Sequence, residues 1–120
     1  MRVATVAEVA QDLGVSAVSV YAAINSGRVP ARRALGSTGP FRIFLDDSGQ
    51  VVSPPGPSGR VRWAKPTEVA TQLRVTARLV CSACVNGHIA ARTLFRRWRV
   101  AVDAASGLPL RPDELERFRP

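Results

Sequence analysis

The stretch TVAEVAQDLGVSAVSVYAAINSGRVPAR (Thr5 to Arg32) decides the fold, because the chain contains it twice. Residues 65–92, KPTEVATQLRVTARLVCSACVNGHIAAR, align with it at a constant offset of 60 without a gap, and eleven positions are identical. FRIFLDDSG (41–49) then matches WRVAVDAASG (98–107) once three residues of ALGSTGP are treated as extra loop and one residue is added before the second Gly. We therefore predict a tandem duplication of a unit of about 50 residues.

The segment between the copies has a different composition. SPPGPSG (Ser53 to Gly59) holds only Ser, Pro and Gly. Such a run predicts a partly extended tether of roughly 20 Å, at about 3 Å per residue. We expect a first domain over residues 1–52, a linker over 53–60 and a second domain over 61–120.

Each copy begins with the pattern of a short helix. Thr5 and Glu8 have the spacing of a capping box, and Pro66 suits the first helical position, where its missing N–H needs no partner. Apolar residues then recur at helical spacing, which predicts one buried face. This face is formed by Val6, Val9, Ala10 and Leu13 and, in the second copy, by Val69, Ala70 and Leu73.

A three-residue turn and a second helix follow. GVS (14–16) and RVT (74–76) each end in a residue that can cap a helix, and Val15 and Val75 are expected to fill the angle between the helices. The second helix should end at Gly27 and Gly87, which tolerate the left-handed conformation. This order predicts a helix-turn-helix, with its second helix as the candidate for the DNA major groove.

Strand patterns come next. RVPARRA (28–34) predicts one strand, and FRIFLDDSGQVVS (41–53) predicts a strand, a turn and a second strand. Alternation in Phe41-Arg42-Ile43 and Trp98-Arg99-Val100 should place the apolar side chains in the core and the arginines outside. The expected fold is mainly α with small β wings: two tandem winged helix-turn-helix domains joined by a Pro/Gly linker.

This order of motifs resembles the small winged helix-turn-helix unit of phage excisionases and of the MerR-type DNA-binding domain. The resemblance rests on the GVS turn, Tyr21 in the second helix, a terminal Ser-Gly, a Val-Pro-Ala strand and an aromatic-Arg-aliphatic wing strand, and it covers nearly all of both copies. LRPDELERF (110–118) resembles the helix that closes such units. The second copy departs from the pattern at Arg74, Cys81 and Ala90. The resemblance implies DNA binding.

The charge balance favours a polyanionic partner. Lys and Arg number 17 against 9 acidic residues, for a net charge of +8 and a pI near 11.4. All the cations but Lys65 are arginines, which bind phosphate and guanine well, although a GC-rich genome would also raise the Arg content. Residues 1–60 carry +2 and residues 61–120 carry +6, so the second copy should supply most of the nonspecific affinity.

Candidate DNA contacts are side chains that should face outward from the second helices and the wings. Arg78 is the first choice for base recognition, because a guanidinium can bind O6 and N7 of guanine, worth about 1–3 kcal/mol. The first copy offers small apolar groups and Tyr21, which favour recognition of shape or A·T content. The full set is Ser16, Ala17, Val18, Ser19, Tyr21, Arg28, Arg32, Arg42, Thr76, Arg78, Ser82, Arg92, Arg96, Arg97 and Arg99.

The stretch CSACVNGH (81–88) has the residue types of a zinc site. The first copy has no ligand at the matching positions, and we find no fourth Cys or His, which a structural zinc site would need. We therefore expect no metal or other cofactor, Cys84 packed in the core as a small hydrophobe, and Cys81 at the edge of the helix.

Function classes can be narrowed further. We find no catalytic constellation, so we do not expect an enzyme. No apolar run is long enough for a membrane span, so a cytoplasmic protein is expected, nucleoid-associated when bound to double-stranded DNA. Its role would be that of a phage or mobile-element transcriptional regulator. The alternatives are an excisionase-type recombination directionality factor, self-associating on DNA and bending it, and an adaptor whose degenerate first copy docks an integrase or RNA polymerase.

Overall fold

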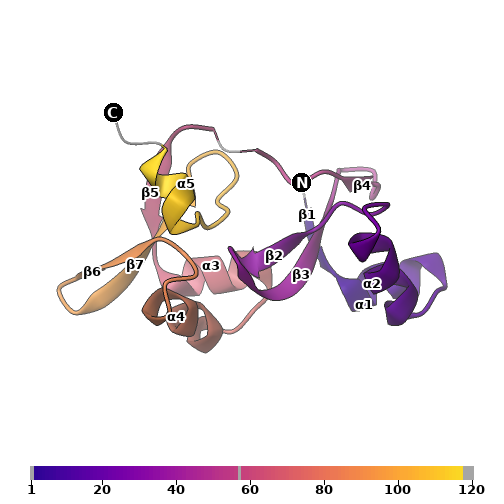
Figure 1. The fold of residues 1–120 in the computed structure, drawn as a ribbon, viewed down its shortest axis with the longest axis horizontal. Helices are drawn as coiled ribbons and strands as arrows, with labels where there is room; N and C mark the ends of the chain where they lie inside the picture. The colour runs from indigo at the N-terminus through magenta and orange to yellow at the C-terminus, as the bar shows by residue number, and fades with distance from the viewer. Residues whose placement is uncertain (1, 57, 118–120) are drawn as a thin grey trace. The chain divides into compact units, whose positions relative to one another are not determined.

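The computed structural model describes residues 2–56 and 58–117, and its ribbon is drawn in Figure 1. The chain divides into two compact units. The first unit is the chain up to Arg32 together with Phe41–Pro54, and the second is Arg33–Pro40 together with the chain from Pro55. The tip of the first hairpin, residues 33–40, is therefore packed as part of the second unit.

The first copy forms two helices and a four-stranded sheet. Its elements are β1 (Arg2–Thr5), α1 (Val6–Leu13), α2 (Ala17–Asn25), β2 (Arg32–Leu35), β3 (Thr38–Leu45) and β4 (Val51–Val52). The strand order is β1-β3-β2, and β4 also pairs with β3. β1 and β4 both run antiparallel to β3.

The second copy repeats this arrangement with a three-stranded sheet and a closing helix. Its elements are β5 (Val61–Ala64), α3 (Pro66–Leu73), α4 (Ala77–Val85), β6 (Ala91–Leu94), β7 (Arg97–Asp103) and α5 (Pro112–Glu116). The strand order is β5-β7-β6, with both neighbours antiparallel to β7. The helix expected over 110–118 is thus shorter, and Phe118 lies outside the described residues.

The expectation of a mainly helical fold was wrong. Helix accounts for about 34% of the structure and strand for about 30%, in two antiparallel sheets. The sequence pattern missed β1 and β5, which precede the first helix of each copy. Four residues are too few to show a clear alternation, and these strands form because β3 and β7 offer a free edge for their backbone hydrogen bonds.

The local signals at the helix ends are confirmed. Thr5 Oγ1 accepts from Glu8 N at 3.2 Å while Glu8 Oε1 accepts from Thr5 N at 3.1 Å, which completes the capping box. Ser16 caps α2 and Thr76 caps α4 through their hydroxyl oxygens. Gly27 takes a φ of 81° after α2, as its conformational freedom allows.

The core of the first unit lies between its helices and one face of β3. Buried residues of β1, α1, α2 and β3 pack together there: Ala4, Val6, Val9, Ala10, Val20, Ile43 and Leu45. The opposite face of β3 is also covered, since Phe44 has no exposed surface and Arg42 is only 7% exposed. The prediction that Arg42 faces outward was wrong, because alternation places it on the same covered face as Phe44.

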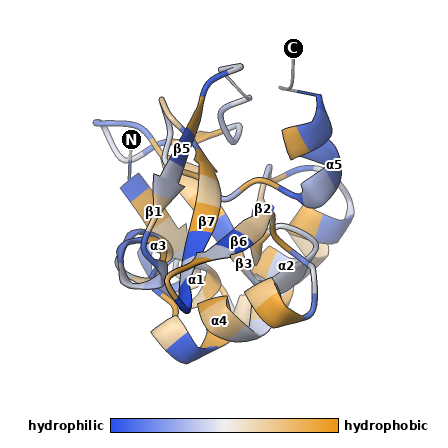
Figure 2. Cartoon of the chain, turned by 90° about the vertical axis from the view of Figure 1, so that its left-hand side faces the viewer, coloured by the Kyte–Doolittle hydropathy of each residue, from blue (hydrophilic) through white to orange (hydrophobic). Residues whose placement is uncertain are grey.

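Two layers cover β7 in the second unit. Val100 and Val102 are fully buried on the face that alternation gives them, and α3 and α4 both contact this strand. Ala101 packs on the other side with Ala90 and Leu110, and half-buried Leu115 joins them from α5. Figure 2 shows α5 as largely hydrophilic, so Leu115 is its apolar anchor.

Candidate nucleic-acid interface

The outer face of α2 is exposed but carries no charged side chain. Ala17, Val18, Ser19, Tyr21 and Ala22 are all accessible, and Val18 is 77% exposed. The cap residue Ser16 is exposed too, although its Oγ accepts from Ser19 N at 3.2 Å. This face offers methyl groups and hydroxyls but no charge. It suits van der Waals contact with a partner better than base recognition.

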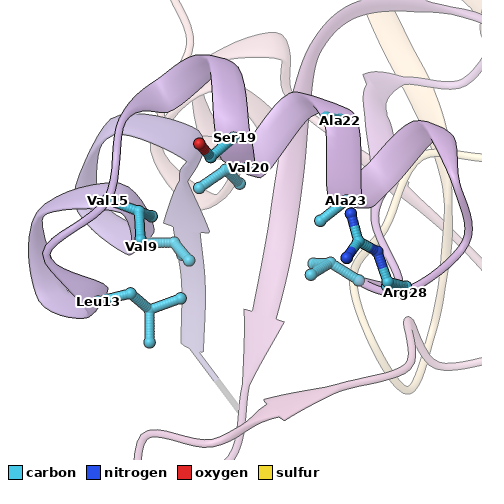
Figure 3. A pocket seen from close by; sticks show the side chains of 9 residues that line it. Val9, Leu13, Val15, Ser19, Val20, Ala22, Ala23 and Arg28 are labelled. Carbon is cyan, nitrogen blue, oxygen red and sulfur yellow. The ribbon is translucent and has the colours of Figure 1, made fainter.

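An apolar groove of about 460 Å³ lies between the helices of the first unit. Figure 3 shows Val9, Leu13 and Val15 on one side and Ala22, Ala23 and Arg28 on the other. Leu13 is 64% exposed and Val15 46% exposed, so the predictions that Leu13 is buried and that Val15 fills the helix angle were wrong. A leucine and a valine this exposed mark the groove as unusually apolar for a surface.

The second unit buries the residue that matches Leu13. Leu73 is 1% exposed, and its neighbour Gln72 donates through Nε2 to the carbonyl oxygen of Ser106 at 2.7 Å. The loop after β7 is therefore attached to the end of α3. In the first unit the corresponding turn folds on itself, because Asp46 Oδ1 accepts from the backbone amides of Ser48 and Gln50 at 2.9 Å each.

The remaining candidate arginines of the first copy do not form a common surface. Arg28 is exposed and donates through Nε to Ser26 Oγ at 3.0 Å. Arg32 is half-buried in β2, and Arg42 is buried, with its Nη1 donating to the carbonyl oxygen of Phe41 at 2.8 Å. Only Arg28 among these three has a freely accessible position for a phosphate.

The outer face of α4 presents one cation among small and apolar groups. Thr76 Oγ1 accepts from Leu79 N at 3.1 Å, which fixes the start of the helix. Arg78 follows two residues later and is exposed, as is Ser82 one turn further on. Figure 2 shows α4 as a mostly apolar helix. Arg78 is the one charged residue in its sequence, ARLVCSACV. This position is typical of a residue that reaches a base edge or a phosphate.

The β6–β7 hairpin carries three more exposed arginines of the second unit, Arg92, Arg96 and Arg97. Arg96 and Arg97 lie at its tip and are exposed. Arg92 is also exposed, and its guanidinium lies over the ring of Trp63, 4.0 Å from the centroid, which orients the side chain. Arg99 is half-buried, and its Nη1 donates to the carbonyl oxygen of Trp98 at 2.8 Å, so it faces outward less than predicted.

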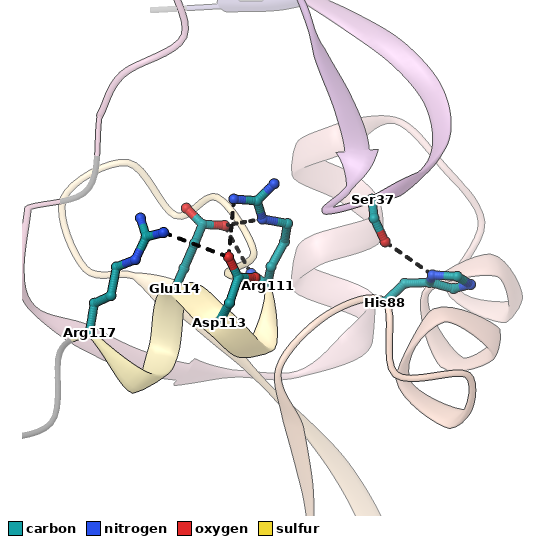
Figure 4. A network of polar contacts seen from close by, with 6 residues as sticks. All are labelled: Ser37, His88, Arg111, Asp113, Glu114 and Arg117. Atoms are coloured by element: carbon teal, nitrogen blue, oxygen red, sulfur yellow. Dashed lines mark hydrogen bonds and ion pairs between the residues drawn. The ribbon is translucent and has the colours of Figure 1, made fainter.

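Acidic side chains of the second unit form ion pairs with arginines outside α4 and the β6–β7 hairpin. Glu68 forms an ion pair with Arg62 at 3.1 Å, and the hydrogen bond from Arg62 lowers the pKa of Glu68. Around α5, Asp113 and Glu114 pair with Arg111, and Asp113 also lies 4.0 Å from Arg117 (Figure 4). Within residues 2–56 and 58–117, no acidic side chain pairs with the surface cations Arg78, Arg92, Arg96 and Arg97.

The cysteines and the histidine are engaged separately. Cys84 is 6% exposed, and burial, with a smaller effect of nearby Cys81, raises the pKa of its thiol to about 11. Cys81 is half-buried at the edge of α4. His88 Nδ1 lies 3.1 Å from Ser37 Oγ, a contact within the second unit that Figure 4 shows. The described part of the chain contains no group of three potential metal ligands.

Comparisons with protein-family models, with curated proteins and with solved structures found no match to this chain. The resemblance to excisionases and MerR-type domains therefore stays a prediction. In residues 2–56 and 58–117, no helix has the length and apolar character to cross a membrane.

Proposed function

We propose that this protein binds double-stranded DNA, chiefly through its second unit. In this proposal α4 enters the major groove with Arg78 toward the base edges, and the β6–β7 hairpin follows the neighbouring backbone. The observation that carries the proposal is the set of arginines on α4 and the hairpin that no described acidic side chain pairs with. Such a surface attracts a polyanion, because its positive charges are not offset by acidic side chains of the protein itself.

The first unit would contribute contacts of a different kind. Its exposed helix α2 offers methyl groups and Tyr21, which can touch thymine methyls and a phosphate. Because both units belong to one chain, binding by the second unit raises the effective concentration of the first near the DNA. A weak, shape-dependent contact can then add to the overall affinity.

We propose a phage or mobile-element regulator that occupies an operator as the biological role. A recombination directionality factor, which binds repeated sites and bends DNA to help an integrase, is the alternative. The arrangement of binding sites separates the two roles. One isolated site over a promoter favours the regulator, whereas clustered direct repeats favour the recombination factor.

Protein docking by the first unit is a second candidate function. It is favoured by the apolar groove around Leu13 and Val15, because Leu13 is 64% exposed there whereas the matching Leu73 is 1% exposed. An integrase or RNA polymerase would be a partner of the expected class. Replacement of Leu13 by Ser, which leaves α4 and the hairpin intact, should then weaken capture of such a protein and leave binding to DNA unchanged.

The primary test is selection of bound duplexes from a random DNA library at near-physiological salt, followed by titration of the selected duplex. Arg78→Ala should lower affinity by about 1–3 kcal/mol, or roughly 5- to 150-fold, and relax the preference at one base pair. Arg117→Ala is the matched control, because it removes one exposed cation at the C-terminal end of α5 that belongs neither to α4 nor to the β6–β7 hairpin. Its effect should stay below about twofold.

Each result of this test has a definite meaning. Two selected motifs at a fixed spacing would support recognition by both units, and one motif would restrict recognition to the second. No enrichment, or equal losses for Arg78→Ala and Arg117→Ala, would contradict the proposal. Replacement of both Arg96 and Arg97 by Ala should also reduce the slope of log affinity against log salt by about 1.8, as expected for two lost phosphate contacts.

A further inference from the structure

The tip of the β6–β7 hairpin exposes an aromatic ring. Leu94 pairs with Arg97 across the hairpin, so the loop itself consists of Phe95 and Arg96. Phe95 is 90% exposed and Leu94 is 45% exposed. Figure 1 shows the hairpin extending away from the helices of its own unit, which leaves the tip clear of the second core. A phenylalanine this exposed buries almost no apolar surface, so it contributes almost no hydrophobic free energy to folding.

The backbone conformation at the tip is also strained for a phenylalanine. Phe95 has a φ of 51° and Arg96 a φ of 64°, both in the left-handed region. Two-residue hairpin loops of this kind favour Asn-Gly, because bulky side chains are strained at positive φ. In the loop between β2 and β3, the residue with a positive φ is a glycine, Gly36, at 70°. The second hairpin thus keeps a strained phenylalanine where a strain-free residue is available.

Positive charge surrounds the ring. Arg96 and Arg97 follow it directly, and both are exposed without a described acidic partner. An apolar side chain between guanidinium groups fits a DNA groove, since an apolar wedge can enter a base step while the cations hold the flanking phosphates. A bare apolar partner surface would instead leave both arginines without counterions.

We propose that Phe95 inserts between neighbouring base pairs from the minor groove and kinks the duplex beside the site bound by α4. This inference rests on the proposed function and deepens it, because it assigns the hairpin a base step as its target. Insertion of such a wedge bends DNA by roughly 20–90°. It would make bending a property of one molecule, without any need for neighbours on the DNA.

The test compares bending and binding by three proteins on the selected duplex, with fluorescence energy transfer between dyes at the two DNA ends. Phe95→Asn removes the ring, retains Arg96 and Arg97 and suits the positive φ, so the hairpin should be preserved or stabilised. Phe95→Leu keeps an apolar wedge. We expect bending by the wild type and by Phe95→Leu and straight DNA with Phe95→Asn. A 2-aminopurine at the inserted step should brighten only in the first two complexes.

Affinity separates this inference from the function on which it rests. Phe95→Asn should change affinity by less than about tenfold, because the lost contacts are offset by restored base stacking. Its salt dependence should match the wild type, since the phosphate contacts remain. Binding with straight DNA, or equal bending by Phe95→Asn, would overturn the wedge alone and leave the tip for another macromolecule. Absence of duplex binding by the wild type would instead overturn the proposed function.

Discussion

Leu13 and Leu73 occupy the same position in the two copies, but truncation of Leu73 should cost far more stability than truncation of Leu13. Leu73 is 1% exposed, so Leu73→Ala removes a buried side chain and leaves a cavity, which costs about 2–5 kcal/mol. Leu13 is 64% exposed, and Leu13→Ala should cost less than about 0.5 kcal/mol. With a urea dependence of about 1 kcal/mol per molar, Leu73→Ala should lower the unfolding midpoint of its unit by about 2 M or more.

Tryptophan fluorescence provides the assay, because Trp63 and Trp98 both belong to the second unit and are the only tryptophans in the sequence. Amide hydrogen exchange in α1 and α2 reports on the first unit without a fluorophore. Similar losses from the two substitutions, each measured in its own unit, would refute the assigned difference in burial. A loss below about 1 kcal/mol for Leu73→Ala would do the same.

Three further outcomes are expected. Arg74 has a φ of 58° at the end of α3, so Arg74→Gly should relieve strain and raise the free energy of unfolding of the second unit by about 1 kcal/mol in urea titrations. Burial raises the pKa of Asp103, but hydrogen bonds from Ser58 and Ser106 lower it further and leave it below the ordinary value. The ionised Asp103 therefore contributes to the free energy of unfolding above about pH 4, and this contribution is lost as the pH falls toward the folded pKa. In urea titrations at pH 3 to 7, Asp103→Asn should make the free energy of unfolding less dependent on pH. The buried Cys84 thiol, with its pKa near 11, should react with iodoacetamide more slowly than Cys81 at pH 8, whereas similar rates by mass spectrometry would show that α4 opens readily.

Much of the candidate site could be placed from the sequence, because its elements are set by local interactions. The repeat at a constant offset identified both pairs of helices, and the caps at Ser16 and Thr76 fixed where the second helix of each pair begins. Side chains such as Arg78 and Ser82 are exposed as the helical period predicts. The exposed Phe95 was missed, since its position in a two-residue loop depends on the register of β6 and β7.

Sequence by itself determined the duplication, the helix ends and the sign of the charge, because each depends on neighbouring residues or on composition. Tertiary structure decided burial. Identical leucines at positions 13 and 73 differ in exposure, and the loop after β7 is hydrogen-bonded to the end of α3 through Gln72, whereas the turn at Asp46 is closed by hydrogen bonds to its own backbone. Arg42 is buried although its pattern matches that of Arg99, since both faces of β3 are covered. A residue's period gives the face of its element, and only long-range packing determines whether that face meets another part of the chain or the solvent.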